Sequence, residues 1–227
     1  MIMERKFGRL VSFDARSRLY PIRQAVRALD PVTKIWACDK VLDQGSEPSC
    51  TGHGAAHCLI AEPVPMGWID HPFAVKLYNG AKDNDEWPGS DYSGSSVNGV
   101  LKYMKLLGLI TGWKWAFTHL DAQLGVGHFG PGIAGTNWYS GMIETDSEGY
   151  IHVTGQNEGG HCYLFLGVDV QKQAFIIHNS WGSDWGRNGR AFLSFDDYEK
   201  LRVNQGEMAF IEGEVDPQSP PPEPEKK

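Results

Sequence analysis

Apolar and polar residues follow a helical period in one stretch of the chain and a β-like texture in its second half. The helical stretch covers residues 96–107, where apolar positions recur three or four residues apart at Val97, Val100, Leu101, Met104 and Leu107. This spacing places them on one face of an α-helix, and Gly108 supplies a C-terminal stop. We therefore expect an amphipathic helix whose apolar stripe belongs to the core.

Two further helices are predicted upstream. Ser49 is the expected N-cap of a helix that begins near Cys50 and ends before Pro63. A second helix is predicted over 70–77, with Pro72 near its first position, where proline is favoured. Cys50 should therefore lie in the first turn of a helix.

From about residue 132 the chain changes to short runs rich in β-branched and aromatic residues. These runs predict strands over 132–138, 162–170, 174–178, 190–195 and 207–211. A helical half followed by a sheet half indicates an α+β fold, with an antiparallel sheet or barrel in the second half.

The same pattern divides the chain into an arm, one globular domain in two lobes, and a tail. The expected bounds are 1–40 for the arm, 41–120 and 121–212 for the helical and β lobes of a domain over 41–212, and 213–227 for the tail. The tail is rich in proline and charged residues, which do not build a core, so we expect it to be disordered.

Net charge, the length of apolar runs and the number of cysteines limit the classes of function that the chain can have. The 227 residues carry a formal net charge of -7 without a Lys/Arg cluster, which argues against nucleic-acid or anionic-membrane partners. No apolar run approaches the ~20 residues of a bilayer span, and the N-terminus lacks the apolar core of a signal peptide. Four cysteines are too few and too irregular for a disulfide framework. We expect a cytoplasmic protein, and its oligomeric state stays open.

Four residues occur in the order and spacing of a hydrolase with a cysteine nucleophile: Gln44, Cys50, His161 and Asn179. They supply a thiol, a base, an amide that orients the base, and an amide for the oxyanion, which are the parts that acyl transfer needs. Lowering a thiol pKa from ~8.5 to ~3–4 corresponds to about 7 kcal/mol. A helix N-terminus supplies only ~0.3–2 kcal/mol of this, so a protonated His161 should supply most of the rest. The fold must therefore bring both lobes together, with the site in a cleft between them.

The chain resembles the papain-like cysteine peptidases, and is closest in texture to short bacterial and phage members. The resemblance rests on Gln44-Gly45 six residues before Cys50, on the Gly160-His161 pair, and on the run that opens with Asn179-Ser180-Trp181-Gly182. It covers about residues 41–211.

This resemblance implies a two-lobed fold, an endopeptidase acting on protein or peptide substrates, and no metal or cofactor. It assigns Gln44, Cys50, His161 and Asn179 the roles given above. It also suggests four residues that contact the substrate: Gly94, Ser95, Gly160 and Trp181.

The chain departs from the family at Pro48 and Thr51, where a glycine and an aromatic residue are usual. Both positions fall on the predicted cleft wall, so they affect substrate selectivity or activity itself. The arm is much shorter than the usual inhibitory propeptide. We therefore expect no zymogen of the usual kind, although the arm can still cross the cleft.

Three alternatives stay open from the sequence. The same residues suit an amidase or a peptidoglycan-directed hydrolase, since a Cys/His/polar triad cleaves any suitable amide. The fold can also serve as a catalytically silent binding or structural module. Finally, one helical face carries Cys50, His53 and His57, whose spacing superficially resembles that of metal ligands. A metal site would leave Gln44 and Asn179 unexplained.

Overall fold

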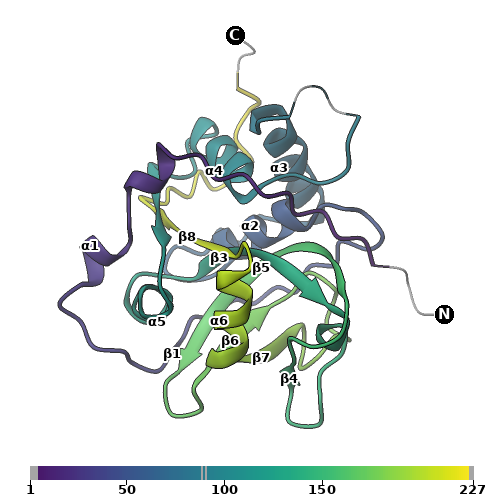
Figure 1. The fold of residues 1–227 in the computed structure, drawn as a ribbon. Helices are drawn as coiled ribbons and strands as arrows, with labels where there is room; N and C mark the ends of the chain where they lie inside the picture. Colours follow the sequence, from purple (N-terminus) through teal and green to yellow (C-terminus); the bar gives the residue numbers. More distant parts are fainter. Residues whose placement is uncertain (1–4, 88, 90, 225–227) are drawn as a thin grey trace.

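The computed structural model describes residues 5–87, 89 and 91–224 (Figure 1). Its helices are α1 Arg23–Val26, α2 Cys50–Ile60, α3 His71–Asn84, α4 Val97–Leu106, α5 His119–His128 and α6 Phe195–Val203, with short 3-10 turns at Ser17–Leu19 and Ser140–Met142. Its strands are β1 Lys34–Ile35, β2 Gly112–Ala116, β3 Gly132–Tyr139, β4 Tyr150–Ile151, β5 Asn157–Asp169, β6 Ala174–His178, β7 Arg190–Ser194 and β8 Glu207–Glu212. The three predicted helices, α2, α3 and α4, precede most of the strands.

The strands form one mixed sheet in the order β2-β8-β3-β5-β6-β7-β4, and β1 adds to β5 outside this path. Every pairing is antiparallel except that of β4 with β7. The long strand β5 lies at the centre, paired with β3 on one side and β6 on the other. The predicted α+β fold with a largely antiparallel sheet is confirmed.

The three predicted helices are present, and their starts show why. Asp70 and Ser96 cap α3 and α4 by accepting hydrogen bonds from the amides of Phe73 and Gly99. The expected capping by Ser49 is wrong, because the Ser49 side chain makes no capping bond to α2. Its hydroxyl lies 3.2 Å from Nδ1 of His53 instead.

Three well-formed elements were not predicted from the sequence: β2, α5 and α6. The helix α5 begins with a reciprocal capping box between Thr118 and Asp121, and Ser194 caps α6. Neither helix carries a strong apolar repeat, since α5 contains Gly125 and Gly127 and α6 is largely charged. The capping residues therefore indicate these two helices better than hydrophobic periodicity does.

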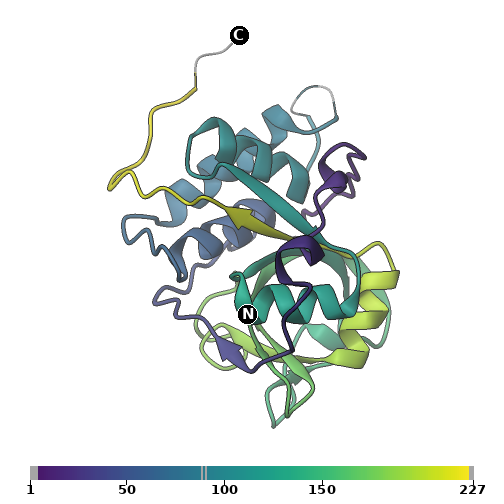
Figure 2. The same cartoon turned by 90° about the vertical axis from the view of Figure 1, so that its left-hand side faces the viewer.

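Two apolar cores lie on opposite faces of the sheet. One is formed mainly by α2, α3 and α4, with Leu59, Leu77 and Leu101 fully or almost fully buried. The other lies on the opposite face of the sheet and includes Phe165 and Phe175. Figures 1 and 2 show the helical group above the sheet, with α5 and α6 packed around its lower part. The helix α2 packs directly against β5, so the two lobes meet at these elements.

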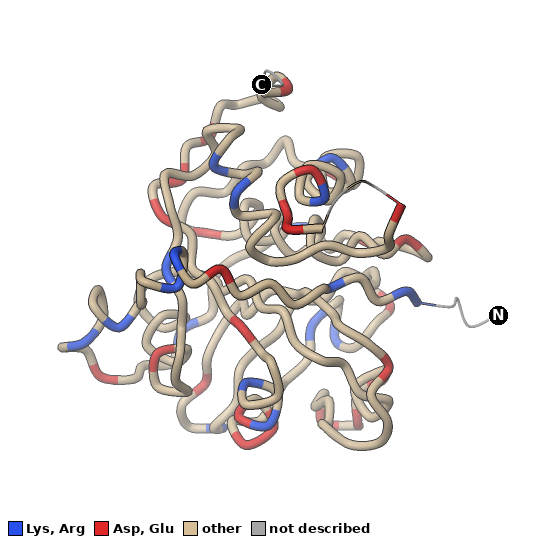
Figure 3. The backbone as a smooth tube through the Cα atoms, turned by 45° about the horizontal axis from the view of Figure 1, so that its top comes forward, with Lys and Arg blue, Asp and Glu red and all other residues tan. Residues whose placement is uncertain are grey.

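The described arm, from Arg5 onward, runs across the front of the molecule between the helical group and the sheet (Figure 1). Basic and acidic residues are interspersed over both lobes along the tube in Figure 3. Within the described part of the chain, none of the helices has the length and apolarity to cross a bilayer.

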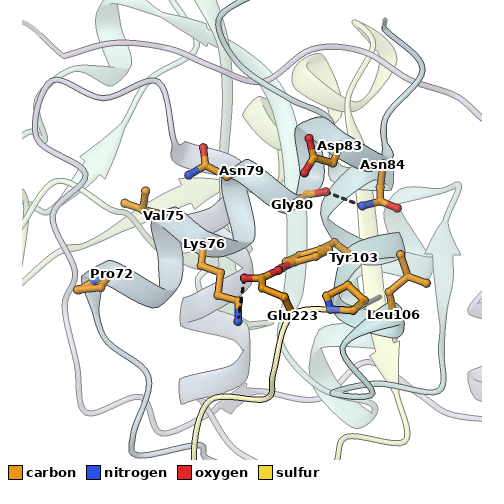
Figure 4. A pocket seen from close by; sticks show the side chains of 11 residues that line it. Pro72, Val75, Lys76, Asn79, Gly80, Asp83, Asn84, Tyr103, Leu106 and Glu223 are labelled. Atoms are coloured by element: carbon orange, nitrogen blue, oxygen red, sulfur yellow. Dashed lines mark hydrogen bonds and ion pairs between the residues drawn. The ribbon is translucent and has the colours of Figure 1, made fainter. Parts of the chain in front are cut away.

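The end of the chain passes over α3 and α4. The Trp68 indole donates to Asp216, and the Tyr103 hydroxyl donates to Glu223 at 2.7 Å. A groove of about 1100 Å³ lies between these helices and the tail (Figure 4). Its lining includes none of the predicted catalytic residues, so this groove and the candidate site are different places.

Candidate active site

Cys50 is the first residue of α2 and is completely buried. The backbone amides of Cys162, Gly8 and Thr51 lie beside its sulfur and favour the thiolate. Cys162 follows His161 directly in β5, so this strand carries both the predicted base and the residue whose amide lies beside the Cys50 sulfur. The start of α2 therefore lies against the central strand β5. The sequence analysis expected such a contact between the two lobes.

His161 is held by Asn179, as predicted. Nε2 of His161 lies 2.8 Å from Oδ1 of Asn179, and that oxygen also accepts the amide of Ser180. Nδ1 of His161 is buried and has no hydrogen-bond partner among the described residues. With Nε2 donating to Asn179, the lone pair of Nδ1 is available to take a proton from a thiol.

The side-chain amide of Gln44 donates to two backbone carbonyl groups. Nε2 of Gln44 donates to the carbonyls of Lys6 and Glu47, at 3.1 and 2.7 Å. Oε1 of Gln44 accepts a hydrogen bond of 2.8 Å from the Ser180 hydroxyl, which fixes the orientation of the amide. Ser180 was not singled out from the sequence, although it lies beside Asn179. It ties the oxyanion candidate to the loop that holds the histidine.

Indole rings enclose the imidazole. The ring centroids of Trp138 and Trp181 lie 4.8 and 5.1 Å from that of His161. Phe7 of the arm approaches the same imidazole edge-on at 5.8 Å. These rings exclude water from the His161–Asn179 hydrogen bond, which strengthens it.

The four predicted substrate-contacting residues touch the arm. The Ser95 amide donates to the Gly8 carbonyl at 2.7 Å, and the Ser95 carbonyl accepts from Leu10 at 2.8 Å. The carbonyl of Gly160 accepts the Arg9 amide at 2.8 Å.

The two remaining residues contact the arm at Gly8 and at Arg5. Gly94 has φ +94°, and a Cβ there would collide with the Gly8 carbonyl oxygen. The carbonyl of Trp181 accepts from the Arg5 guanidinium. The arm therefore occupies the positions at which a substrate was expected.

The arm lies over the site without matching an attack geometry. Gln44 contacts the carbonyl of Lys6, while the Cys50 sulfur lies beside the amide of Gly8, which belongs to the next peptide bond. An oxyanion donor and a nucleophile must address the same carbonyl group for acyl transfer. The arm covers the thiol in a register that does not favour its own cleavage.

Burial reverses the expected pKa shifts. Desolvation raises the pKa of the Cys50 thiol to about 11, against the smaller opposing effect of nearby backbone amides. Desolvation likewise lowers the pKa of His161 to about 4. We expected a thiolate and an imidazolium, but burial penalises both charged forms. With the arm in place the structure favours a neutral thiol and a neutral imidazole.

The metal-like spacing on α2 does not produce a metal site. His53 faces Ser49 and lies 3.0 Å from Nδ1 of His71, whereas Nε2 of His57 accepts the Leu42 amide. Across the residues that the structure describes, no group of three His, Cys, Asp or Glu side chains is arranged to hold a metal ion.

The two departures from the family lie close to the thiol. The carbonyl of Pro48 presses against Gly8, where a Cβ would collide with its oxygen. The Thr51 side chain is buried, and its hydroxyl has no hydrogen-bond partner among the described residues. Pro48 therefore helps to shape the path of the arm.

Sequence reasoning missed Arg9 and Glu207. Their side chains are completely buried and form an ion pair, with Nη2 of Arg9 3.0 Å from Oε1 of Glu207. A usable signal was the position of Glu207 directly before four consecutive apolar residues of a strand. A carboxylate in such a strand requires a partner.

Comparisons with known proteins agree with this geometry. No protein-family model matches the chain. A stretch of 63 residues is 38% identical to a cathepsin B-like cysteine proteinase of Schistosoma japonicum, covering 27% of this chain and 18% of that protein. A stretch of 62 residues is 36% identical to cathepsin B-like cysteine proteinase 4 of Caenorhabditis elegans, covering 26% and 18%. The chain thus spans less than a fifth of the length of these two relatives.

Similarity to solved structures extends over almost the whole chain. Xylellain, a cysteine protease from Xylella fastidiosa, superposes with a TM-score of 0.71 and 19% identity, covering 95% of this chain and 100% of that one. Procathepsin B S9 from Trypanosoma congolense superposes with a TM-score of 0.64 and 12% identity, covering 92% and 87%. The chain therefore has the two-lobed fold of the papain-like cysteine proteases.

Proposed function

We propose that the chain is a cysteine endopeptidase that hydrolyses peptide bonds through a thioacyl intermediate on Cys50. The observation that carries this proposal is the hydrogen bond of 2.8 Å between His161 and Asn179, which leaves Nδ1 of the buried imidazole without a partner among the described residues. The amide of the next residue, Cys162, lies beside the Cys50 sulfur. An oriented base next to a thiol is the requirement for nucleophilic catalysis.

The roles follow from the contacts. Nδ1 of His161 takes the proton of Cys50 as the sulfur attacks the carbonyl carbon, and the resulting imidazolium then protonates the leaving amine. The Gln44 amide and the Cys50 backbone amide donate to the oxyanion, and one such donor is typically worth about 2.7–4 kcal/mol. Water activated by His161 then releases the acyl group. This chemistry requires no metal or cofactor.

The arm must move before a substrate can enter. Residues 5–10 take the hydrogen bonds of Ser95, Gly160 and Gln44, and the Cys50 side chain is completely buried beneath them. In this proposal the covered, neutral thiol is the resting state. Access of water and substrate then favours the thiolate–imidazolium pair. A cytoplasmic location is part of the proposal, and the four free cysteines are compatible with a reducing compartment.

The test is labelling of Cys50 by an epoxide or iodoacetamide probe, together with hydrolysis of an unstructured protein. Both should be lost in Cys50→Ala and retained in Cys58→Ala, which removes another buried thiol of the same helix. Turnover of cell-wall peptides alone would indicate the amidase or peptidoglycan-directed alternative. An unreactive thiol in a variant with a displaced arm would indicate a silent module.

A further inference from the structure

We propose that the groove between α3 and α4 is a binding site for an acidic, proline-rich segment of a partner protein. The tail passes over this groove and indicates what the site accepts (Figure 4). The inference starts from the tail residue Glu223, which contacts Lys76 of α3 and Tyr103 of α4. None of the predicted catalytic residues lines the groove, so the inference goes beyond the proposed function.

The groove binds a carboxylate through two donors. The Tyr103 hydroxyl donates to Oε2 of Glu223 at 2.7 Å, and Nζ of Lys76 lies 3.2 Å from Oε1 of the same side chain. Burial and the neighbouring carboxylate raise the pKa of Tyr103, so its hydroxyl stays protonated and remains a donor. Hydrogen bonds to a charged acceptor are stronger than those to a neutral one. The site should therefore prefer glutamate to glutamine.

Close packing of α3 against α4 gives the Tyr103 ring its position. A Cβ at Gly80 of α3 would lie 2.2–2.3 Å from three carbon atoms of this ring. Real Cβ atoms do not approach other atoms so closely, so the ring lies across α3 because residue 80 has no side chain. Tyr103 is only 4% exposed. The two helices therefore fix the donor, and its position does not depend on the tail.

The proline run contacts the same lysine through its backbone. Residues 219–224 include four prolines, which fix φ near −65° and favour an extended conformation at the residue before each of them. Such a segment is pre-ordered and loses little conformational entropy on binding. Nζ of Lys76 donates to the Pro221 carbonyl at 3.0 Å. Lys76 thus contacts both the proline run and the carboxylate of Glu223.

A second acidic residue of the tail is held near the start of α3. The Trp68 indole donates to Oδ1 of Asp216 at 2.8 Å. The same indole packs edge-on against Phe73 of α3, with 4.7 Å between the ring centroids. The helical lobe therefore contacts an acidic residue on each side of the proline run. This order of residues defines the chemistry of the partner segment.

The tail can be displaced by a segment that fills more of the groove. The Lys76 and Glu223 side chains are 24% and 68% exposed, and exposed ion pairs contribute little. With the tail in place about 1100 Å³ of the groove stays open, lined in part by Val75, Asn79 and Leu106. A partner segment that enters this space would bury more apolar surface than the tail does. The tail then acts as an internal competitor with an effective concentration on the order of 1 mM.

The test measures binding of a fluorescent peptide with the sequence of residues 214–224 to two full-length proteins by fluorescence anisotropy. The parent keeps its own tail, and the variant Asp216→Ala/Glu223→Ala lacks both anchoring carboxylates. The peptide should bind the variant at least about tenfold more tightly than it binds the parent, in which the tail competes. A second peptide that carries Glu223→Gln should bind the variant about tenfold more weakly than the first.

Substitutions in the groove identify the contact. Added to the variant, Tyr103→Phe should weaken binding of the first peptide about tenfold and that of the Glu223→Gln peptide less than about threefold. If Tyr103→Phe does not fold, Lys76→Met replaces it and should weaken the first peptide by at least about threefold. Lys105→Met is the control, because Lys105 is an exposed residue of α4 outside the groove lining. It should leave both affinities unchanged.

Three outcomes overturn the inference: no saturable binding to the variant, equal binding of the two peptides, or affinities that neither Tyr103→Phe nor Lys76→Met changes. Sedimentation velocity adds a fourth. If the parent dimerises with rising concentration and Glu223→Ala abolishes the dimer, the groove binds the tail of a second copy instead of a partner protein. Labelling of Cys50 plays no part in these measurements. Failure of this inference therefore leaves the proposed function standing, and failure of the proposed function leaves this inference standing.

Discussion

The arm is held over the candidate site by two ion pairs of very different character. At one end the Arg9 and Glu207 side chains are both completely buried. At the other end Arg5 and Asp43 remain 21% and 41% exposed. Exposed pairs contribute about 0–1 kcal/mol, whereas removing one partner of a buried pair costs about 3–5 kcal/mol. The difference indicates that the buried pair decides whether the site is covered, and the exposed pair only guides the end of the arm.

The largest effect should come from Arg9→Ala. This change leaves Glu207 buried without its closest cation, so the arm should lose its covered position. We expect alkylation of Cys50 at neutral pH to accelerate by about a hundredfold, measured by mass spectrometry. The variant Arg16→Ala is the control, since Arg16 pairs with Asp14 at the surface. An equal acceleration in both variants would mean that the buried pair does not hold the arm.

The pH dependence of alkylation sharpens the same comparison. Burial raises the pKa of Cys50 to about 11, so in the parent protein the thiolate fraction should rise about tenfold per pH unit below that value. In Arg9→Ala, hydration should let His161 stabilise the thiolate. Its rate should therefore change less than about threefold between about pH 6 and 9. Parallel pH profiles of the two proteins would contradict the idea that the arm sets the pKa.

A smaller effect is expected from Gly8→Ala. The added methyl group would collide with the Pro48 carbonyl, and overpacking of this kind costs about 1–3 kcal/mol. We expect Cys50 alkylation to accelerate about tenfold. Gly67→Ala is the matched control, because nothing lies within 4 Å of a Cβ at that position. An unchanged rate in Gly8→Ala would show that the arm tolerates displacement at its closest approach to the thiol.

The smallest effect should come from Arg5→Ala. Its partner Asp43 is part-exposed, and salt screens such pairs. We expect the alkylation rate to change by less than about threefold, with the remaining difference disappearing in high salt. Hydrolysis and alkylation measured at low and high ionic strength check this. If Arg5→Ala changed the alkylation rate as much as Arg9→Ala does, the exposed pair would hold the arm as strongly as the buried pair.

Much of the fold was accessible from the sequence because its signals are local. The repeat from Val97 to Leu107 marks one helix that the structure contains, and Pro72 near the start of 70–77 marks another. The spacing of His161 and Asn179 likewise predicted a pair that the structure brings within hydrogen-bond distance. Elements without such periodicity, such as α5, were missed because tertiary packing rather than an apolar stripe stabilises them.

The contacts of the arm could not be predicted from local signals in the sequence. Its hydrogen bonds join Gly8 to Ser95 and Arg9 to Gly160, positions far apart in the chain. Nothing in the sequence near Arg9 indicates a buried partner almost two hundred residues later. The expected charge state of the site failed for the same reason. Desolvation by a distant segment reverses the shifts that the helix start and His161 would otherwise produce.

The aromatic enclosure of the imidazole has a spectroscopic consequence. Trp181 is only 2% exposed, and its indole is flanked by Phe7 and by the Arg5 guanidinium. Indole emission shifts to longer wavelength when water gains access to the ring. Departure of the arm would therefore shift the emission maximum of the protein's intrinsic fluorescence. The molecule thus contains its own optical probe, which can follow opening in real time without an attached dye.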